Sequence, residues 1–557
     1  MPRPRSPSPV AHPPPRPCPA RRRDPSVSPE SPPELPEPLL SVRGLTITAP
    51  GSRTPPVRDV CLDIGVGETH ALVGESGAGK TLTARAVLGM LPYGAELSGT
   101  VRFAGRDIEP GGQRRLWGHA IGYVPQDALS VLSPVHPVGD QLTASLRSLG
   151  SLSRRQARAC AVAALDRVGI PDAPRRARAY PHEFSGGMRQ RAVIALATLH
   201  RPRLLVADEP TTALDPLVQD QILHLLAEQR AASEAALLLI THDLPLVSRW
   251  ADRITVLHGG AVQETGPVPR VLTEPKAAYT RRLLDATRHG HRPPPEGTDE
   301  PLLSVRDLTV SYPGRRRGEA PVTAVDKVSF DVARGETLAL IGASGSGKSS
   351  TAEAVLRLRP ATSGSVRFAG RDLLELDDTQ MRALRPHIQP VFQDPYGSLS
   401  PRQRIRDAIA EPLRVQGRWN DTNGPDRVDE LLRQVGLDPA LGTRRPHELS
   451  GGQCQRIGIA RALASEPEVL ILDEPVSGLD PTVRAGVLDL LESLQRKLGL
   501  GYLFICHDMD VVTSFAHRVA VLKDGKIVET LPAEALAAPG ECHPYTRALL
   551  TAACEFA

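Results

Sequence analysis

Short, unbroken runs of apolar residues recur along the chain and predict buried strands. The runs Arg203–Ala207 and Ala236–Ile240 are matched later by Val469–Leu472 and Tyr502–Ile505. Strands without polar alternation are typical of a parallel sheet that is covered on both faces. Further strands are expected just before two glycine-rich segments, at Glu68–Val73 and Glu336–Ile341.

Helical periodicity occupies the stretches between these strands. The residues after each glycine-rich segment favour a helix, and so do Arg154–Gly169 and Asp426–Gly436. The last two lie far from the predicted strands along the chain and would form a helical subdomain. Strands that alternate with helices predict an α/β fold with a mainly parallel sheet.

The chain consists of two similar halves, which form an internal sequence repeat. Leu39–Thr46 returns almost unchanged as Leu302–Thr309, and such self-similarity indicates an internal repeat. Other pairs follow in the same order: Gly74–Thr81 with Gly342–Ser349, Phe103–Asp107 with Phe368–Asp372, Pro181–Glu183 with Pro446–Glu448, and Asp208–Pro210 with Asp473–Pro475. We therefore expect two domains of about 250 residues, at 39–287 and 301–557, with a short proline-rich linker at 288–300.

Composition places most of the chain in the ordinary globular class. Of its 557 residues, 40% are hydrophobic and 23% are charged, and the net charge is only +4, so nothing demands a nucleic acid partner. The seven cysteines never fall in a C-x-x-C spacing, which argues against a disulfide scaffold or structural zinc. No apolar run approaches the roughly 20 residues of a membrane-spanning helix, so a path across a membrane would have to come from other subunits.

The first 38 residues differ from the rest. Met1–Pro38 contains fifteen prolines and several arginines, a composition that can neither form an amphipathic helix nor bury enough surface to become ordered. We expect a disordered tail; the alternatives are a misassigned start codon and a transit peptide, and the proline density and the lack of an apolar core disfavour the transit peptide.

Two glycine-rich segments carry the pattern G-x-x-x-x-G-K-[ST]. Gly74–Thr81 and Gly342–Ser349 both stand between a predicted strand and a predicted helix, the context of a P-loop that surrounds phosphate with backbone N–H groups. A glycine-rich turn with a surface lysine is the simpler alternative, but two equivalent matches favour phosphate binding. The pattern assigns Lys80 and Lys348 to the β- and γ-phosphates, and Thr81 and Ser349 to Mg²⁺.

Acidic pairs end one predicted strand in each half. An aspartate there, Asp208 or Asp473, can bind a metal through water, and the glutamate that follows, Glu209 or Glu474, can orient or deprotonate an attacking water. A solvated loop is the usual reading of such a pair alone, but the preceding P-loops favour catalysis. A histidine closes a further strand in each half and could contact the γ-phosphate: His242 in Thr-His-Asp and His507 in Cys-His-Asp.

The segments that decide the family are Phe184–Arg191 and Leu449–Arg456, each with Ser-Gly-Gly at a predicted helix start. A helix start binds anions, so each half would own a second phosphate-binding surface. Here the chain resembles the ABC transporter ATPases, whose signature motif is Ser-Gly-Gly-Gln, over nearly all residues from Leu39 onward. The resemblance also covers glutamines and aspartates of the kind found in Q-loops and D-loops: Gln126, Gln393, Asp215 and Asp480.

The resemblance implies two P-loop ATPase domains, each with a RecA-like sheet core and a helical subdomain. It implies head-to-tail pairing within the chain, with one ATP between the Lys80 loop and Ser450–Gly452 and the other between the Lys348 loop and Ser185–Gly187. Both sites would hydrolyse ATP. Two departures are visible: Met188 replaces the signature glutamine, and Ala49 stands where the second half has Tyr312, a candidate for stacking on adenine.

The residues that the resemblance assigns to ATP are Gly74, Glu75, Ser76, Gly77, Ala78, Gly79, Lys80, Thr81, Gln126, Ser185, Gly186, Gly187, Tyr312, Gly342, Ala343, Ser344, Gly345, Ser346, Gly347, Lys348, Ser349, Gln393, Ser450, Gly451 and Gly452. Those assigned to Mg²⁺ are Thr81, Gln126, Asp208, Ser349, Gln393 and Asp473. Those assigned to catalysis are Glu209, Glu474, His242 and His507.

Four segments narrow the resemblance to the dipeptide, oligopeptide and nickel importers: Gln393–Arg402, Glu411–Leu413, Ala278–Leu284 and His543–Leu550. The fused arrangement is similar to that of glutathione-type importers. It implies two membrane permeases, an extracytoplasmic solute-binding protein, and a peripheral place at the cytoplasmic face of the membrane. Peptide, nickel-complex and glutathione-like cargo all stay open, and the direction of transport rests on the resemblance.

Tandem ABC ATPases that act on ribosomes or DNA are the alternative class. The former join their domains by a long charged helical linker, and the latter carry zinc-binding cysteine pairs or long coiled coils. The sequence contains none of these, so a transport role is favoured.

Overall fold

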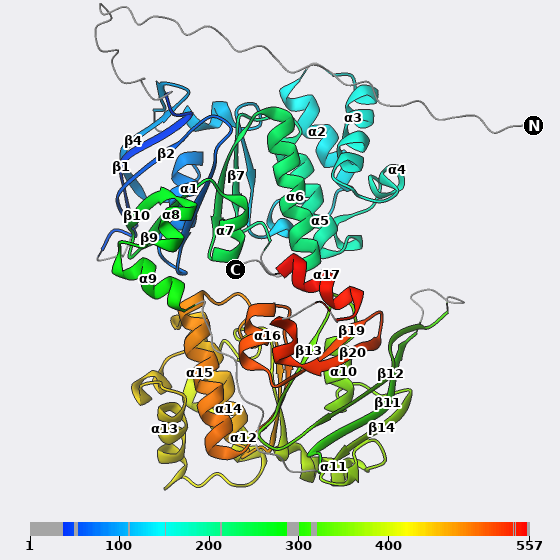
Figure 1. Cartoon of the computed structure of the whole chain (residues 1–557). Helices are drawn as coiled ribbons and strands as arrows, with labels where there is room; N and C mark the ends of the chain where they lie inside the picture. The colour runs from blue at the N-terminus through cyan, green and yellow to red at the C-terminus, as the bar shows by residue number, and fades with distance from the viewer. Residues whose placement is uncertain are drawn as a thin grey trace, which may run out of the picture. The chain divides into compact units, whose positions relative to one another are not determined.

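The computed structural model describes residues 37–49, 54–109, 112–150, 152–211, 214–286, 300–313, 320–537, 540 and 542–553 (Figure 1). Nearly all of the predicted tail and of the predicted linker lies outside these residues. We call the described residues up to 286 the first half and those from 300 onward the second half. The domain boundaries stay predictions.

The central sheet of the first half places the phosphate-binding loop. Its strands run in the order β10-β9-β3-β8-β7-β6, and all neighbours are parallel except β9 and β10. These strands are β3 (Thr69–Gly74), β6 (Ile121–Val124), β7 (Leu204–Asp208), β8 (Ala236–Thr241), β9 (Arg253–His258) and β10 (Ala261–Pro267). Every residue of β3, β7 and β8 is buried, so the apolar runs form interior strands as predicted.

A second sheet in the first half is antiparallel and was not predicted. It has the order β2-β1-β4-β5, formed by β1 (Leu40–Thr48), β2 (Val57–Ile64), β4 (Glu96–Phe103) and β5 (Arg106–Asp107). In β2 buried and exposed residues alternate in part, as expected when one face of a sheet meets water. This sheet packs through Leu40, Val42 and Leu45 on the same core as α1 and the inner face of the central sheet.

Helices of the first half connect and cover the strands. They are α1 (Lys80–Leu88), α2 (Val138–Leu149), α3 (Arg154–Arg167), α4 (Ala173–Arg176), α5 (Gly186–Thr198), α6 (Pro216–Ser233), α7 (Leu244–Trp250), α8 (Val268–Thr273) and α9 (Ala278–Asp285), with short 3₁₀ turns at Gly112–Leu116, Ala128–Ser130 and Pro181–Glu183. The predicted helix at Arg154–Gly169 is α3, which begins with a capping box formed by Ser153 and Gln156. It packs against α2 and α5 as part of the helical subdomain.

The second half repeats this architecture. Its central sheet has the order β16-β17-β18-β13-β19-β20 and its antiparallel sheet the order β12-β11-β14-β15. The strands are β11 (Leu303–Tyr312), β12 (Val322–Val332), β13 (Thr337–Ile341), β14 (Ser363–Phe368), β15 (Arg371–Asp372), β16 (Ile388–Val391), β17 (Val469–Asp473), β18 (Gly501–Ile505), β19 (Arg518–Lys523) and β20 (Lys526–Pro532). Because the strand orders of the two halves correspond, the sequence repeat is also a structural repeat.

Helices of the second half follow the same plan. They are α10 (Lys348–Val355), α11 (Asp378–Leu384), α12 (Ile405–Val415), α13 (Gly424–Gln434), α14 (Gly451–Leu463), α15 (Pro481–Leu498), α16 (Met509–Phe515) and α17 (Pro544–Ala553), with 3₁₀ turns at Arg385–His387, Pro439–Thr443, Pro446–Glu448 and Ala533–Ala537. The predicted helix at Asp426–Gly436 is α13, which begins two residues earlier than predicted, at Gly424.

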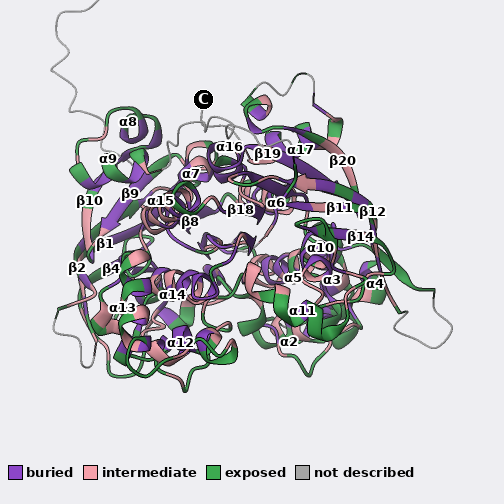
Figure 2. Ribbon diagram, turned by 90° about the horizontal axis from the view of Figure 1, so that it is seen from below, coloured by how far each residue is buried: buried purple, intermediate pink, exposed green. Residues whose placement is uncertain are grey.

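Each half has its own hydrophobic cores, with buried strands inside and exposed residues on the outer helices (Figure 2). Leu72 and Leu340, in the strands that lead to the two glycine-rich loops, are fully buried. Burial of one such side chain contributes about 1.5–3 kcal/mol. The loops therefore start from the most rigid part of each half.

Among the described residues, no helix is both long and apolar enough to cross a lipid bilayer.

Candidate functional site

The two P-loops lie at the carboxyl ends of the central strands. Strand β3 ends at Gly74 and α1 begins at Lys80, while β13 ends at Ile341 and α10 begins at Lys348. A Cβ on Gly74 would lie 2.2 Å from the carbonyl oxygen of Leu257, and one on Gly342 would lie 2.1 Å from that of Leu522. Only glycine fits at the first position of each loop, because strand β9 or β19 passes directly beside it.

The P-loop lysines are buried and bound to their own loops. Lys80 Nζ donates to the carbonyls of Gly74 (2.6 Å) and Glu75 (2.9 Å). Lys348 Nζ donates to those of Gly342 (2.7 Å) and Ala343 (3.0 Å). Burial lowers the pKa of both lysines, since an ammonium group loses hydration there. An anion in the loop would stabilise both charges, so the cradle fits phosphate.

The aspartate that ends β7 or β17 faces the hydroxyl at the start of the P-loop helix. Thr81 Oγ1 donates to Asp208 Oδ1 (3.1 Å), and Asp208 is only 1% exposed. Burial and the charge of Glu474 raise the pKa of Asp473 to about 6. Asp473 Oδ1 is buried and has no hydrogen-bond partner among the described residues. A buried carboxylate oxygen without a partner fits a divalent cation, which prefers oxygen ligands.

In the first half, three side chains converge next to Asp208. Gln126 Nε2 donates to Glu209 Oε2 (2.8 Å), and His242 Nδ1 lies 3.2 Å from Glu209 Oε1. They come from the ends of β6, β7 and β8, strands that are neighbours in the sheet. Glu209 has a φ of 46°, a left-handed conformation that costs a residue other than glycine about 1–3 kcal/mol. Such strained backbone conformations are common at functional sites, where the position of the side chain is kept despite the cost in stability.

The second half contains the same arrangement. Gln393 Nε2 donates to Glu474 Oε2 (2.8 Å), and His507 Nδ1 lies 3.2 Å from the same oxygen. Burial alone would raise the pKa of Glu474, but the neighbouring His507 lowers it below its usual value. Burial opposes the charge of His507, yet Glu474 raises its pKa. Each group therefore favours the charged form of the other.

The signature segments cap two helices. Ser185 accepts a hydrogen bond from the Met188 N–H at the start of α5, and Ser450 accepts one from the Gln453 N–H at the start of α14, each at 3.3 Å. In return, Gln453 Oε1 accepts a hydrogen bond from the Ser450 N–H (3.0 Å). Met188 has no group to do this and packs against the core instead. The departure seen in the sequence thus removes one capping bond from the first signature.

Contacts across the two halves join each D-loop to the opposite P-loop. Asp215 Oδ1 caps α6, and its Oδ2 accepts the Ser344 N–H (3.1 Å) of the second P-loop. In the reverse direction, the Thr482 hydroxyl, two residues after Asp480, lies 2.6 Å from Glu75 Oε1 of the first P-loop. We call this region of reciprocal contact the seam.

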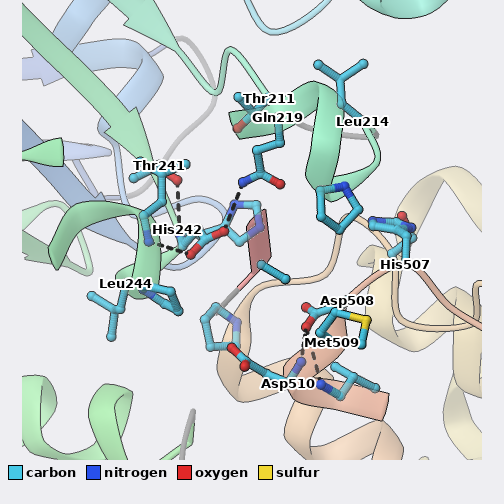
Figure 3. Close-up of a pocket in the computed structure, with 18 of the residues that line it drawn as sticks. Thr211, Leu214, Gln219, Thr241, His242, Leu244, His507, Asp508, Met509 and Asp510 are labelled. Atoms are coloured by element: carbon cyan, nitrogen blue, oxygen red, sulfur yellow. Dashed lines mark hydrogen bonds between the residues drawn. The ribbon is translucent and has the colours of Figure 1, made fainter. Parts of the chain in front are cut away.

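A cavity at the seam is lined by residues of both halves, and His242 and His507 both lie along it (Figure 3). Asp508, which follows His507, pairs with Arg484 of α15, whereas Asp243 accepts a bond from Gln219 of α6 (3.3 Å). Each of these pairs lies within one half, and all four residues line the cavity.

The structure places every predicted site residue except Tyr312 at an end of the central sheet or at a helix start. The P-loop residues lie between β3 and α1 or between β13 and α10, the glutamines follow β6 or β16, and the serines and glycines of the signatures begin α5 and α14. Tyr312 ends β11 of the antiparallel sheet: its hydroxyl shares a hydrogen bond with Ser350 of α10 (2.8 Å), and Arg359 lies 4.5 Å above its ring. Its stacking on adenine stays a prediction.

Sequence reasoning missed the roles of Thr482 and of Tyr545, which reaches the second P-loop from α17. Tyr545 does carry a sequence signal, because the repeated Tyr-Thr-Arg near the end of each half contains it. Thr482 carries none, since Leu217 stands at the equivalent place in the first half.

The fold and the site define a pair of P-loop nucleotide hydrolases within one chain. The ABC transporter family matches residues 57–212 and 325–477. The chain belongs to this family and is an ABC ATPase, as the resemblance in the sequence predicted.

Two relatives match across nearly the whole chain. The peptidoglycan transport ATP-binding protein YejF of Agrobacterium fabrum is 43% identical over 530 residues, which cover 93% of this chain and 96% of that protein. The glutathione import ATP-binding protein GsiA of Escherichia coli K12 is 42% identical over 536 residues, 89% of this chain and 86% of that protein. Among solved structures, a dimeric ATP-binding cassette bound to ADP and phosphate is 27% identical, covers 42% of this chain and 99% of its own, and has a TM-score of 0.38.

Proposed function

We propose that this chain is the ATPase subunit of an importer for peptides or a related small solute. Dipeptides, oligopeptides, nickel complexes and glutathione-like molecules are the cargo classes. Two separate permeases would form the path, a solute-binding protein outside the membrane would deliver cargo, and the chain would lie at the cytoplasmic face. The names of the two relatives, one in peptidoglycan transport and one in glutathione import, support this proposal.

In the proposed reaction the two halves hydrolyse ATP at the seam. The backbone of each P-loop, with Lys80 or Lys348, binds the phosphates. Glu209 or Glu474 orients the attacking water and accepts its proton, while His242 or His507 contacts the γ-phosphate.

Mg²⁺ would be held by Thr81 and Asp208 in the first half and by Ser349 and Asp473 in the second, with Gln126 and Gln393 beside them. When bound, it neutralises charge on the phosphates. The unpartnered Asp473 oxygen supports this assignment.

The observation that carries the proposal is the reciprocal contact at the seam. Asp215 contacts the P-loop of the second half, and Thr482 contacts that of the first. Each P-loop is therefore positioned partly by the other half. Nucleotide placed between a P-loop and the opposite signature would favour the closed pairing, and hydrolysis would release it. A permease that senses the pairing would then shift between two states.

Replacement of both glutamates tests the ATPase roles. Glu209→Gln with Glu474→Gln removes both proposed bases and leaves the P-loops intact, so we expect ATP to stay bound and phosphate release to stop. Release of phosphate from [γ-³²P]ATP and retained nucleotide after gel filtration are measured. Glu234→Gln, an exposed glutamate at the end of α6, is the matched control. Sustained phosphate release by the double variant would contradict the assignment.

Uptake tests the transport role. In the organism that carries the gene, the double variant replaces the native chain, and uptake of a radiolabelled dipeptide, glutathione and ⁶³Ni with a chelator is followed. We expect loss of uptake for one of these classes and normal uptake with Glu234→Gln. Unchanged uptake of all three, with the chain sedimenting with ribosomes rather than with membranes, would contradict the importer proposal.

A further inference from the structure

The last helix, α17, contacts both halves. It begins at Pro544 and belongs to the second half, where Leu549 and Leu550 are buried in the core. The same helix packs against α6 of the first half. Leu217, in the first turn of α6, also packs against the core of the second half. Helix α17 is therefore one of the elements that hold the seam together.

Tyr545, in the first turn of α17, reaches the second P-loop. The Ala343 N–H donates to the Tyr545 hydroxyl (3.0 Å), and the Ala343 carbonyl accepts the bond from Lys348 Nζ (3.0 Å). The next residue, Ser344, donates its N–H to Asp215 of the first half. Two adjacent P-loop residues are thus held from three directions: by α17, by the P-loop lysine and by the opposite D-loop.

The environment of Tyr545 keeps its hydroxyl in the neutral form. Burial raises its pKa above the usual value, and the charge of Asp215 acts in the same direction. Lys523 lies 5.0 Å from the centre of its ring. A neutral hydroxyl can accept the Ala343 N–H without placing a negative charge beside the loop that binds phosphate.

The first half has a tyrosine at the equivalent place, but its hydroxyl does not form the hydrogen bond to the P-loop that Tyr545 forms. Tyr279 of α9 stacks on His258, with ring centres 4.0 Å apart. Its hydroxyl is buried and lies beside Glu75 of its P-loop, but makes no hydrogen bond of normal geometry within the part of the chain that the structure describes. The second residue of its P-loop is Glu75, whose carboxylate contacts Thr482 across the seam. In the first half, therefore, a P-loop side chain contacts the opposite half, whereas Ala343 has no polar side chain and its backbone is bound by Tyr545 instead.

We propose that Tyr545 is a positioning residue of the second ATP site. Its hydrogen bond with the Ala343 N–H fixes the position of Ala343, whose carbonyl accepts the hydrogen bond from Lys348. Because α17 also packs on α6 of the first half, this hydrogen bond depends on how the two halves pair. The second P-loop takes its binding geometry only when the seam is formed. This inference rests on the proposed ATPase role of Lys348 and adds a residue to which the sequence assigned no role in binding ATP or Mg²⁺ or in catalysis.

Tyr545→Phe tests the inference, because it removes the hydroxyl and keeps the ring. Steady-state ATP hydrolysis is measured on the full chain over a range of Mg-ATP concentrations. Loss of one hydrogen bond predicts a rise in KM of roughly 2- to 10-fold with a smaller change in kcat. Tyr279→Phe is the matched control and changes KM less than about twofold, because its hydroxyl lies beside Glu75 without a hydrogen bond of normal geometry. Equal KM values for Tyr545→Phe and wild type would overturn the inference.

Hydrogen exchange supplies a readout that a loss of folding does not imitate. Peptides that contain Gly342–Ser349 and Gly74–Thr81 are followed by mass spectrometry in wild type and in both variants. We expect faster exchange in the second P-loop of Tyr545→Phe only, with the first P-loop unchanged. Faster exchange over the whole second half would mean a general structural role and would also overturn the inference. If wild type itself releases no phosphate while exchange behaves as expected, the proposed function fails rather than this inference.

Discussion

The second glycine of each signature segment should resist replacement by alanine for a steric reason. A Cβ on Gly452 would lie 2.3 Å from Cγ1 of Val483 in α15, and one on Gly187 would lie 2.7 Å from Cγ1 of Val218 in α6. The preceding glycine has room: a Cβ on Gly451 would lie 3.8 Å from Leu479 Cδ2. Gly451→Ala is therefore a matched control in the same helix turn.

The magnitude follows from the difference between the two positions. Both substitutions gain helix propensity of up to about 1 kcal/mol, because alanine replaces glycine in a helix. Only Gly452→Ala forces an overlap, and overpacking costs about 1–3 kcal/mol. Val483 is β-branched and has few rotamers with which to move away. The two variants should therefore differ in free energy of unfolding by about 1–3 kcal/mol.

Thermal unfolding is the assay. For a domain of this size, 1 kcal/mol shifts the midpoint by about 2–4 °C, so Gly452→Ala should melt several degrees below Gly451→Ala. Val483→Ala in the Gly452→Ala background should recover most of the difference, since it removes the atoms that overlap. The reasoning is refuted if Gly452→Ala and Gly451→Ala have the same thermal midpoint, or if Val483→Ala does not raise the midpoint of Gly452→Ala.

Two further predictions concern buried groups of the second half. Cys454 is buried and its pKa is raised to about 11, whereas Cys61 and Cys160 are exposed. Maleimide labelling followed by peptide mapping should therefore modify Cys61 and Cys160 in the native chain, and Cys454 only in denaturant. Fast labelling of Cys454 in the native chain would contradict the packing. Burial and the charge of Glu474 raise the pKa of Asp473 to about 6, so in metal-free buffer the folded protein binds more protons than the unfolded chain between about pH 4 and that pKa, and stability falls as pH rises through this window. Asp473→Asn should consequently raise the thermal midpoint at pH 7.5, with an advantage that shrinks below about pH 6, and a midpoint at or below that of wild type at pH 7.5 would refute this account.

Much of the fold could be predicted because its signals are local. Apolar runs such as Ala236–Ile240 became interior strands, since a segment without polar residues can only be covered on both faces. The helix at Arg154 began where predicted because Ser153 and Gln156 cap it. The antiparallel sheet of each half was not predicted. Its strands, such as β4 with buried positions only near its end, carry weak alternation, and their pairing depends on partners far along the chain.

The chemistry of each motif was also readable from the sequence, because a P-loop, an acidic pair or a signature is contiguous. The residues that each motif contacts could not be predicted from the sequence. Gln126, Glu209 and His242 are far apart in sequence, and only the order of the parallel strands brings them within hydrogen-bond distance.

The sequence by itself determined the α/β class, the repeat and the ABC ATPase family, because backbone conformation and burial leave a periodic or contiguous pattern along the chain. The tertiary structure alone decided how the halves meet, through Asp215 on Ser344 and Thr482 on Glu75, and how Tyr545 reaches Ala343 within the second half. A contact between distant residues leaves no local pattern, since any residue of suitable length and polarity can make it once the folded backbone brings the partners together.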